Sequence, residues 1–181
     1  MTARHVGLMG WLLGGSIIVA GMVAEAAGLR INTTPSLPRG LWLVVGDPGL
    51  VRIGDVVTFC PPLVPVIELA QERGYVGPGN CPGGLELMMK PVVALAGDTV
   101  AVSSVGVTVN GQVLVDSVPL SRDGAGRLLP QAETGPGTVA EGQVWVLSSH
   151  NVRSFDSRYF GPIPHAHLTA ILRPLWTETS P

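Results

Sequence analysis

Glycine and proline interrupt the apolar segments of this chain so often that few of them can form a long helix. The 181 residues include 24 glycines and 16 prolines. Between them lie short apolar runs such as 41–45 (LWLVV) and 55–59 (DVVTF), which have the length of strands rather than of helices. The sequence therefore predicts a mostly β fold with irregular loops.

The clearest local signal is the segment 107–115, where residues with high strand propensity flank Asn110 and Gly111. Asn-Gly is the dipeptide preferred in a type I′ hairpin turn, so this segment is predicted to be an antiparallel hairpin. Only residues 66–74 have the pattern of a short helix, which Gly74 would end. The other strand segments are 91–102, divided in two at Gly97-Asp98, 143–149 and 168–176.

No charged side chain occurs from Val6 to Ala24, a stretch close to the roughly 20 apolar residues that span a bilayer. A buried core helix or a cleaved signal peptide are alternatives, and residues 24–26 (AEA) have the small-x-small pattern of a cleavage site. The run is longer than the roughly 7–15 apolar residues of a signal peptide, however. The segment 6–28 is therefore predicted to be an uncleaved, single transmembrane anchor.

The short N-terminus sets the expected orientation of this anchor. Arg4 and His5 precede it, and basic residues favour the cytoplasmic side. Residues 1–5 are therefore expected in the cytoplasm, and residues 29–181 are expected to form one domain on the other side of the membrane.

The net charge of −2 and the pI near 6.0 leave no basic footprint, so a nucleic-acid partner is not expected. The two cysteines, Cys60 and Cys81, fit a disulfide in an oxidising compartment, which would stabilise the fold by about 3 kcal/mol. They have no histidines near them and no H-E-x-x-H occurs, so neither a metal site nor a cofactor is predicted.

Ser36 lies in the stretch 32–42 (NTTPSLPRGLW), directly after the predicted anchor. Pro35 and Pro38 restrict the backbone on both sides of this serine. The stretch is either a rigid linker or a device that presents a hydroxyl stiffly beside a membrane.

Lys90 is the only lysine of the chain and lies in the apolar run 85–98. Its stem would cover apolar surface if its ammonium reaches water. Burial would instead lower its pKa and make the neutral amine a base for a serine hydroxyl. Among the histidines, only His150 is retained as an alternative base.

A third polar stretch, 148–164 (SSHNVRSFDSRYFGPIP), contains a dense alternation of hydroxyl and charged groups. It is either a polar turn with an Asp156–Arg158 pair or an extended segment. In the extended form Ser154, Asp156 and Arg158 would share one side and Ser157 would point away.

Together these stretches resemble the TraF-type conjugative-transfer peptidases, which belong to the serine–lysine signal peptidase superfamily. The resemblance covers nearly the whole chain and depends on the order of its parts: an anchor, NTTPSLPRGLW, FCPP followed by RGYVGPGNCPGG, KPVVALAGDTV, and SFDSRYFGPIP. It implies a signal-peptidase-like antiparallel β domain.

The resemblance also implies the roles of the site residues. Ser36 would be the nucleophile and Lys90 the general base, while Asp156, Arg158 and Ser154 would support them. The Thr34 hydroxyl and the Ser36 backbone N–H would form the oxyanion hole. The Cys60–Cys81 insertion also fits this subgroup.

By the same resemblance the chain would process a membrane-bound pilin precursor for conjugative DNA transfer, releasing the product either by hydrolysis or, in the manner of pilin cyclases, by ring closure. Its expected location is the bacterial inner membrane with the catalytic domain in the periplasm, beside components of a conjugative type IV secretion system. Ser36-Leu37-Pro38 lacks the methionine of the Ser-Met-x-Pro pattern of general leader peptidases. A general type I leader peptidase and a catalytically silent scaffold of a secretion pore are the alternatives.

Overall fold

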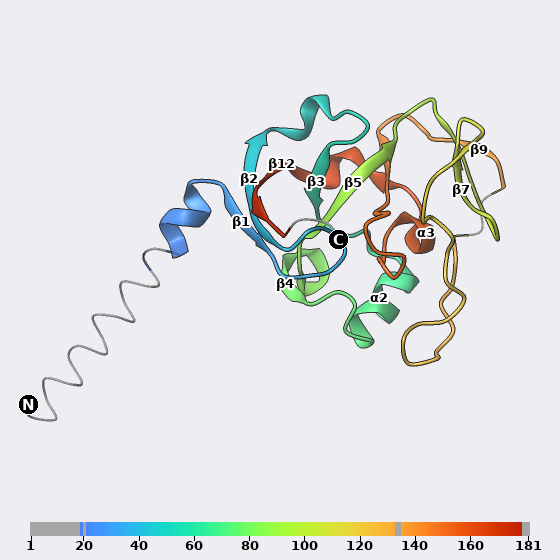
Figure 1. The fold of residues 1–181 in the computed structure, drawn as a ribbon, viewed down its shortest axis with the longest axis horizontal. Coiled ribbons are helices and arrows are strands. Elements are labelled where there is room, and N and C mark those ends of the chain that lie inside the picture. Colours follow the sequence, from blue (N-terminus) through green and yellow to red (C-terminus); the bar gives the residue numbers. More distant parts are fainter. Residues whose placement is uncertain (1–18, 20, 133–134, 179–181) are drawn as a thin grey trace, which may run out of the picture.

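The computed structural model describes residue 19 and the ranges 21–132 and 135–178. Most of the predicted anchor, 6–28, therefore lies outside the described residues. Residues 21–26 are helical and lead into the first strand (Figure 1). Within the part of the chain that is described, no helix is both long and apolar enough to cross a bilayer.

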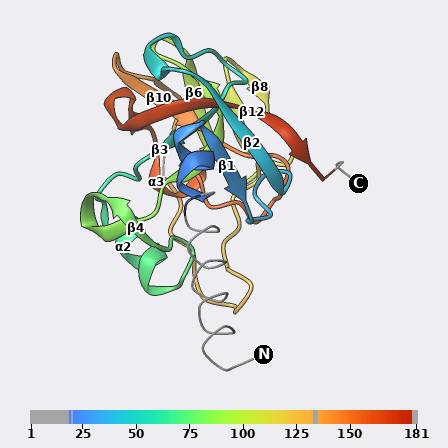
Figure 2. The same ribbon diagram turned by 90° about the vertical axis from the view of Figure 1, so that its left-hand side faces the viewer.

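The strands form two antiparallel sheets, which confirms the predicted mostly β fold. In spatial order, the larger sheet contains β1 (Leu29–Asn32), β2 (Gly40–Gly46), β12 (Leu168–Thr177), β3 (Val56–Phe59), β5 (Met88–Ala94), β10 (Gln143–Val146) and β11 (Ile163–Pro164). The smaller sheet contains β8 (Gln112–Val113), β7 (Gly106–Val109), β6 (Thr99–Ser103) and β9 (Gly137–Thr138). The last strand, β12, pairs with β2 on one side and with β3 on the other. The turned view of Figure 2 shows β12 beside β2.

The helix predicted at 66–74 is present as α2 (Pro65–Glu72). Pro65 fits the first turn because its missing N–H would have no partner there. Gly74, at φ +73°, takes the left-handed conformation that ends the helix. The remaining short elements are β4 (Pro78–Cys81), α3 (Ser157–Phe160), and the 3₁₀ turns η1 (Pro48–Leu50), η2 (Pro82–Gly84) and η3 (His165–His167).

The predicted hairpin connects β7 and β8. Asn110 and Gly111 have φ values of +51° and +81°, and Val109 pairs with Gln112. Two positive φ values at the central positions define a type I′ turn, so the prediction from the Asn-Gly dipeptide is confirmed.

Three hydrophobic clusters hold the fold together. The largest packs α2 against the larger sheet, with Phe59 and Ile67 among its members. The predicted Cys60–Cys81 disulfide is formed, and it closes the segment that carries α2. A second cluster underlies the smaller sheet, and a third joins Leu37 to Trp42 beside β12. The third cluster lies directly behind Ser36, so it supports the loop that carries this serine.

Candidate active site

Ser36 lies in the turn between β1 and β2, whose facing ends pair at Asn32 and Gly40. Gly40 has φ +134°, and a Cβ there would lie 2.3 Å from the backbone oxygen of Trp176 in β12. Only glycine therefore lets the chain leave this turn and pass close to β12.

The residues after Ser36 anchor the turn to the protein interior. Leu37 is buried in the third cluster. The indole N–H of Trp42, on β2, donates to the carbonyl of Pro38 at 3.1 Å. These contacts explain the leucine, proline and tryptophan that follow the serine in the sequence.

Lys90 lies in the middle of β5, where buried and partly exposed residues alternate. Its side chain is on the buried face and is 6% exposed. The Nζ atom donates to Ser36 Oγ at 3.1 Å and to the carbonyl oxygen of Met89 at 3.1 Å. The structure therefore brings the two predicted dyad residues into hydrogen-bond contact, whereas their catalytic roles stay predictions.

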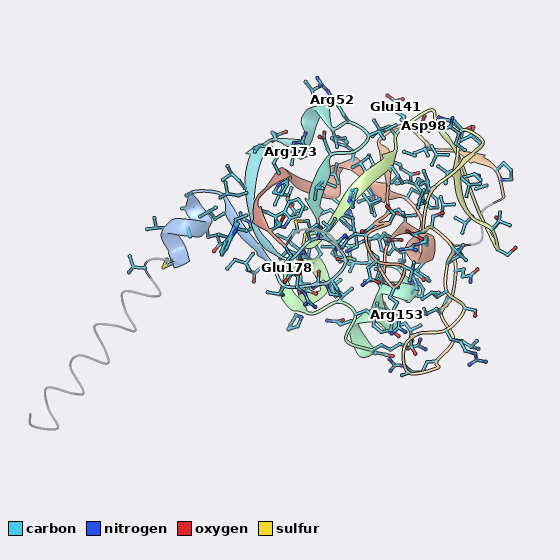
Figure 3. All side chains as sticks on the ribbon, viewed as in Figure 1. Arg52, Asp98, Glu141, Arg153, Arg173 and Glu178 are labelled. Atoms are coloured by element: carbon cyan, nitrogen blue, oxygen red, sulfur yellow. A yellow bond between two sulfur atoms is a disulfide. The ribbon has the colours of Figure 1, made fainter. Side chains whose placement is uncertain are left out.

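Burial lowers the pKa of Lys90 to about 8, because the ammonium loses most of its hydration. The negative charge of Asp156 opposes this shift, the positive charge of Arg158 adds to it, and Glu86 opposes it further. A lysine with such a pKa is partly neutral near pH 8 and can then accept a proton. Charged residues such as Arg52 and Glu141, labelled in Figure 3, lie instead at the outside of the molecule.

Asp156 and Arg158 form a fully buried ion pair next to this dyad. Arg158 donates to the Asp156 carboxylate from Nε and from Nη2, both at 2.8 Å. This bidentate arrangement fixes the plane of the guanidinium relative to that of the carboxylate. The remaining guanidinium hydrogens go to backbone carbonyls, including those of Ser148 and Ser154. The pair is thus satisfied without water.

Of the two alternatives for this stretch, the Asp156–Arg158 pair is formed, and the extended conformation is wrong from Ser157 on, where α3 begins. Asp156 is the N-cap of α3, and its side chain accepts from the backbone N–H of Arg158. Ser157 does not point away but is buried, where its hydroxyl accepts from the N–H of Val146 at 3.0 Å. The capping preference of aspartate therefore decided the local structure.

Ser148, at the end of β10, was not singled out from the sequence, yet it contacts three parts of the site. Its hydroxyl donates to the carbonyl of Ser36, its N–H donates to Asp156 Oδ2 at 3.1 Å, and its carbonyl accepts from Arg158. This residue therefore connects the buried ion pair to the backbone of the candidate nucleophile.

Thr34 lies near Ser36 as expected, with its hydroxyl 3.0 Å from Ser36 Oγ. Within the described residues no acceptor binds the Ser36 N–H, so this group is free for an incoming carbonyl oxygen.

Two other residues considered from the sequence make no hydrogen bond to the dyad in the described part of the chain. The Ser154 hydroxyl oxygen is buried and has no hydrogen-bond partner among the described residues. His150 is exposed and does not line the pocket, so the structure does not bring this alternative base to Ser36.

A pocket of about 660 Å³ opens beside Ser36 and Lys90. Its walls combine the turn before Ser36 with β5 and with more distant segments. The apolar and aromatic residues among them include Met88, Leu129, Phe155 and Tyr159. The arrangement can hold an extended peptide next to a hydroxyl, an amine and a free backbone N–H, which are the groups that acyl transfer needs.

Comparisons with known proteins identify the family of the chain. The family model described as signal peptidase, peptidase S26, matches residues 3–176. A plasmid transfer protein TraF of Escherichia coli is 42% identical over 168 residues, covering 89% of this chain and 93% of that protein. A conjugal transfer protein TraF of Agrobacterium tumefaciens is 37% identical, covering 96% of this chain and 98% of that protein.

Signal peptidases are also similar to the chain. A probable signal peptidase I-1 of Synechocystis is 31% identical over 74% of this chain and 61% of that protein. A crystal structure of a signal peptidase I from Enterococcus faecalis covers 68% of this chain and 97% of its own, with 24% identity and a TM-score of 0.38. The family match spans nearly the whole chain, so the protein belongs to the signal peptidase family, peptidase S26, and is similar within it to the TraF conjugal transfer proteins.

Proposed function

We propose that this peptidase is a membrane-anchored serine endopeptidase that processes a pilin precursor for conjugative DNA transfer by a Ser36/Lys90 dyad. The observation that carries the proposal is the 3.1 Å contact between Lys90 Nζ and Ser36 Oγ, made by a lysine whose burial favours the neutral amine. The names of the TraF relatives support conjugal transfer as the process. The uncharged stretch from Val6 to Ala24 supports an anchor, with the catalytic domain in the periplasm.

The proposed reaction is acyl transfer. Neutral Lys90 takes the proton from Ser36 Oγ while this oxygen attacks the carbonyl carbon of the scissile peptide bond. The Ser36 N–H and the Thr34 hydroxyl stabilise the developing oxyanion. As the C–N bond breaks, the Lys90 ammonium returns the proton to the leaving amine and an acyl-enzyme remains. A water molecule then releases the product, or an amine of the substrate does so and closes a ring.

The test uses the full chain in membranes together with a pilin precursor from the same host. Ser36→Ala and Lys90→Met should each abolish cleavage, since each removes one half of the proton transfer, while the folded protein remains. Full cleavage by either variant would contradict the dyad. Mass spectrometry of the product separates the two release steps, because a circular peptide is one water lighter than the linear one.

A panel of precursors separates this function from that of a general type I leader peptidase, which the likeness to signal peptidases I also supports. Cleavage confined to the pilin precursor would support the proposal. Cleavage of many secretory precursors would favour the general enzyme, and cleavage of none would favour a silent scaffold.

A further inference from the structure

Asn32, the last residue of β1, is buried and lies four positions before Ser36. Its side-chain amide nitrogen lies within hydrogen-bond distance of three backbone carbonyls: those of Thr34 at 3.0 Å, Leu37 at 3.0 Å and Pro38 at 3.1 Å. Its side-chain oxygen accepts from the N–H of Thr34 at 3.1 Å and from the Thr34 hydroxyl at 2.8 Å. Every one of these partners belongs to the turn that carries Ser36.

This arrangement determines which polar groups of the turn face the pocket. The Asn32 amide gathers the three carbonyls on the inner side of the turn, and Ser148 binds the carbonyl of Ser36. These carbonyls of the turn are therefore held by side chains. Within the described residues the Ser36 N–H has no acceptor, and the Ser36 hydroxyl, in a residue that lines the pocket, contacts Lys90 and Thr34.

Asn32 also sets the direction of hydrogen bonding along the hydroxyls. An amide oxygen can only accept, so before substrate binds the single hydroxyl proton of Thr34 points to Asn32, and it must turn away from Asn32 to stabilise the oxyanion during the reaction. The Thr34 oxygen then offers a lone pair to the Ser36 hydroxyl, 3.0 Å away. The Ser36 proton is thus directed to Thr34 while Lys90 is charged, and to Lys90 once this amine is neutral.

We propose that Asn32 is a positioning residue for the nucleophile, and this inference rests on the proposed function of Ser36. Asn32 is among the residues that line the pocket, but all the hydrogen bonds of its side chain go to the turn. It acts through the turn, by holding the Ser36 N–H and hydroxyl in the orientation that attack requires. Misplacement of a reacting group by about 1 Å costs about 100-fold in rate, which sets the size of the expected effect.

The experiment measures how fast a fluorophosphonate probe labels Ser36 in the purified full chain, across a range of pH. This probe reacts with an activated serine and needs no precursor. Asn32→Ala should lower the labelling rate about 100-fold, while the pH at which labelling rises stays near that of the unaltered protein, because Lys90 keeps its surroundings. Asn32→Asp, which has the same shape and keeps the acceptor but loses the donors to the carbonyls, should also label slowly.

Asn110→Ala is the matched control, because it removes the side-chain hydrogen bonds of another asparagine, to Asp98 and from the Thr99 N–H, far from the pocket. It should lower stability and leave the labelling rate unchanged. If the two Asn32 variants label within roughly threefold of the unaltered protein, the proposal is overturned. A clear shift of the pH dependence in Asn32→Ala, which adds no charge, would overturn it too, since Asn32 would then act on Lys90.

The same experiment tells a failure of this inference from a failure of the proposed function. Labelling must map to Ser36 by mass spectrometry and must disappear in Ser36→Ala. If the unaltered protein does not label at Ser36 and Ser36→Ala still cleaves the pilin precursor, the proposed function fails. If it labels there and the Asn32 variants label equally fast, only the positioning role fails.

Discussion

Among the described residues, the Lys90 amine has a hydroxyl and a backbone carbonyl as its hydrogen-bond acceptors, and its pKa is lowered to about 8. Activity should therefore rise through pH 8 as the neutral amine forms. Glu86→Gln should move this rise to lower pH, because the Glu86 charge raises the pKa of Lys90. Glutamine can still accept from the Gly77 N–H, so the local structure should persist. A pH–rate profile of both proteins checks this, and a rise that stays in place or moves to higher pH contradicts it.

The same residue should make the protein less stable than it would be with an apolar side chain. Between about pH 8 and 10.5 the unfolded chain binds the Lys90 proton and the folded chain does not, so stability rises with pH across this window. Lys90→Met removes this dependence and should stabilise the fold at pH 7 by up to about 3 kcal/mol. Urea unfolding at pH 7 and pH 10 measures it. Equal stability of the two proteins at pH 7 would show that the burial of the ammonium costs little.

At the residue scale, the sequence indicated the groups with unusual chemistry but not those that hold them. Ser36 between prolines and a lone lysine in an apolar run are visible without a structure. Asn32 and Ser148 act on backbone carbonyls, whose positions depend on the path of the turn and on the neighbouring strands. No side-chain pattern in the sequence reports such contacts.

At the scale of elements, local signals succeeded where the backbone itself is constrained. The Asn110-Gly111 turn and the helix α2 (Pro65–Glu72), which Gly74 follows, were predictable because turn and cap residues act on their neighbours alone. Residues 154–158 show the limit. Their alternating polarity allowed either a polar turn with an Asp156–Arg158 pair or an extended segment, and the structure has the pair together with a helical turn that Asp156 caps.

The disulfide segment offers a test at this scale, because it supplies both core and pocket residues. Cys60 and Cys81 close a segment that contributes Ile67 and Val76 to the largest cluster and Tyr75 to the pocket. Replacing both cysteines with serine should lower the free energy of unfolding by about 3 kcal/mol, mainly by freeing the unfolded chain. Denaturant unfolding measures this.

In the same double variant KM should increase and kcat should change little, since Tyr75 lines the pocket but does not touch the dyad. Steady-state kinetics on the folded variant separates the two constants. A fall in kcat alone would place the influence of the disulfide on the dyad instead.

At the scale of the whole molecule, the site combines parts that are distant in sequence. Ser36 comes from the turn between β1 and β2, Lys90 from β5, and Ser148 and Asp156 from the region after β10. Hydrophobic periodicity predicts strands but not their order in a sheet. The expectation that Ser36, Lys90 and Asp156 form one site came instead from the order of the motifs that the chain shares with a family.

Arg158, in α3, contacts two of the loops that flank strands of the smaller sheet. Its guanidinium binds Asp156 and the carbonyl of Asp116 in the connection after β8, and its own carbonyl accepts from the N–H of Ala132 in the connection before β9. Arg158→Met leaves the Asp156 carboxylate buried without its partner, so the free energy of unfolding should fall by about 3–5 kcal/mol.

Adding Asp156→Asn to Arg158→Met should restore part of this loss, because no unpaired charge then remains in the interior, and the asparagine oxygen can still accept from the Ser148 N–H. Thermal and denaturant unfolding of the single and double variants measures the difference. The double variant should nevertheless react slowly with the fluorophosphonate probe at Ser36. The guanidinium that binds the Ser148 carbonyl is gone, and Ser148 in turn binds the Ser36 carbonyl. If the double variant is less stable than Arg158→Met alone, the hydrogen bonds of the pair, rather than the balance of its charges, account for its contribution to stability.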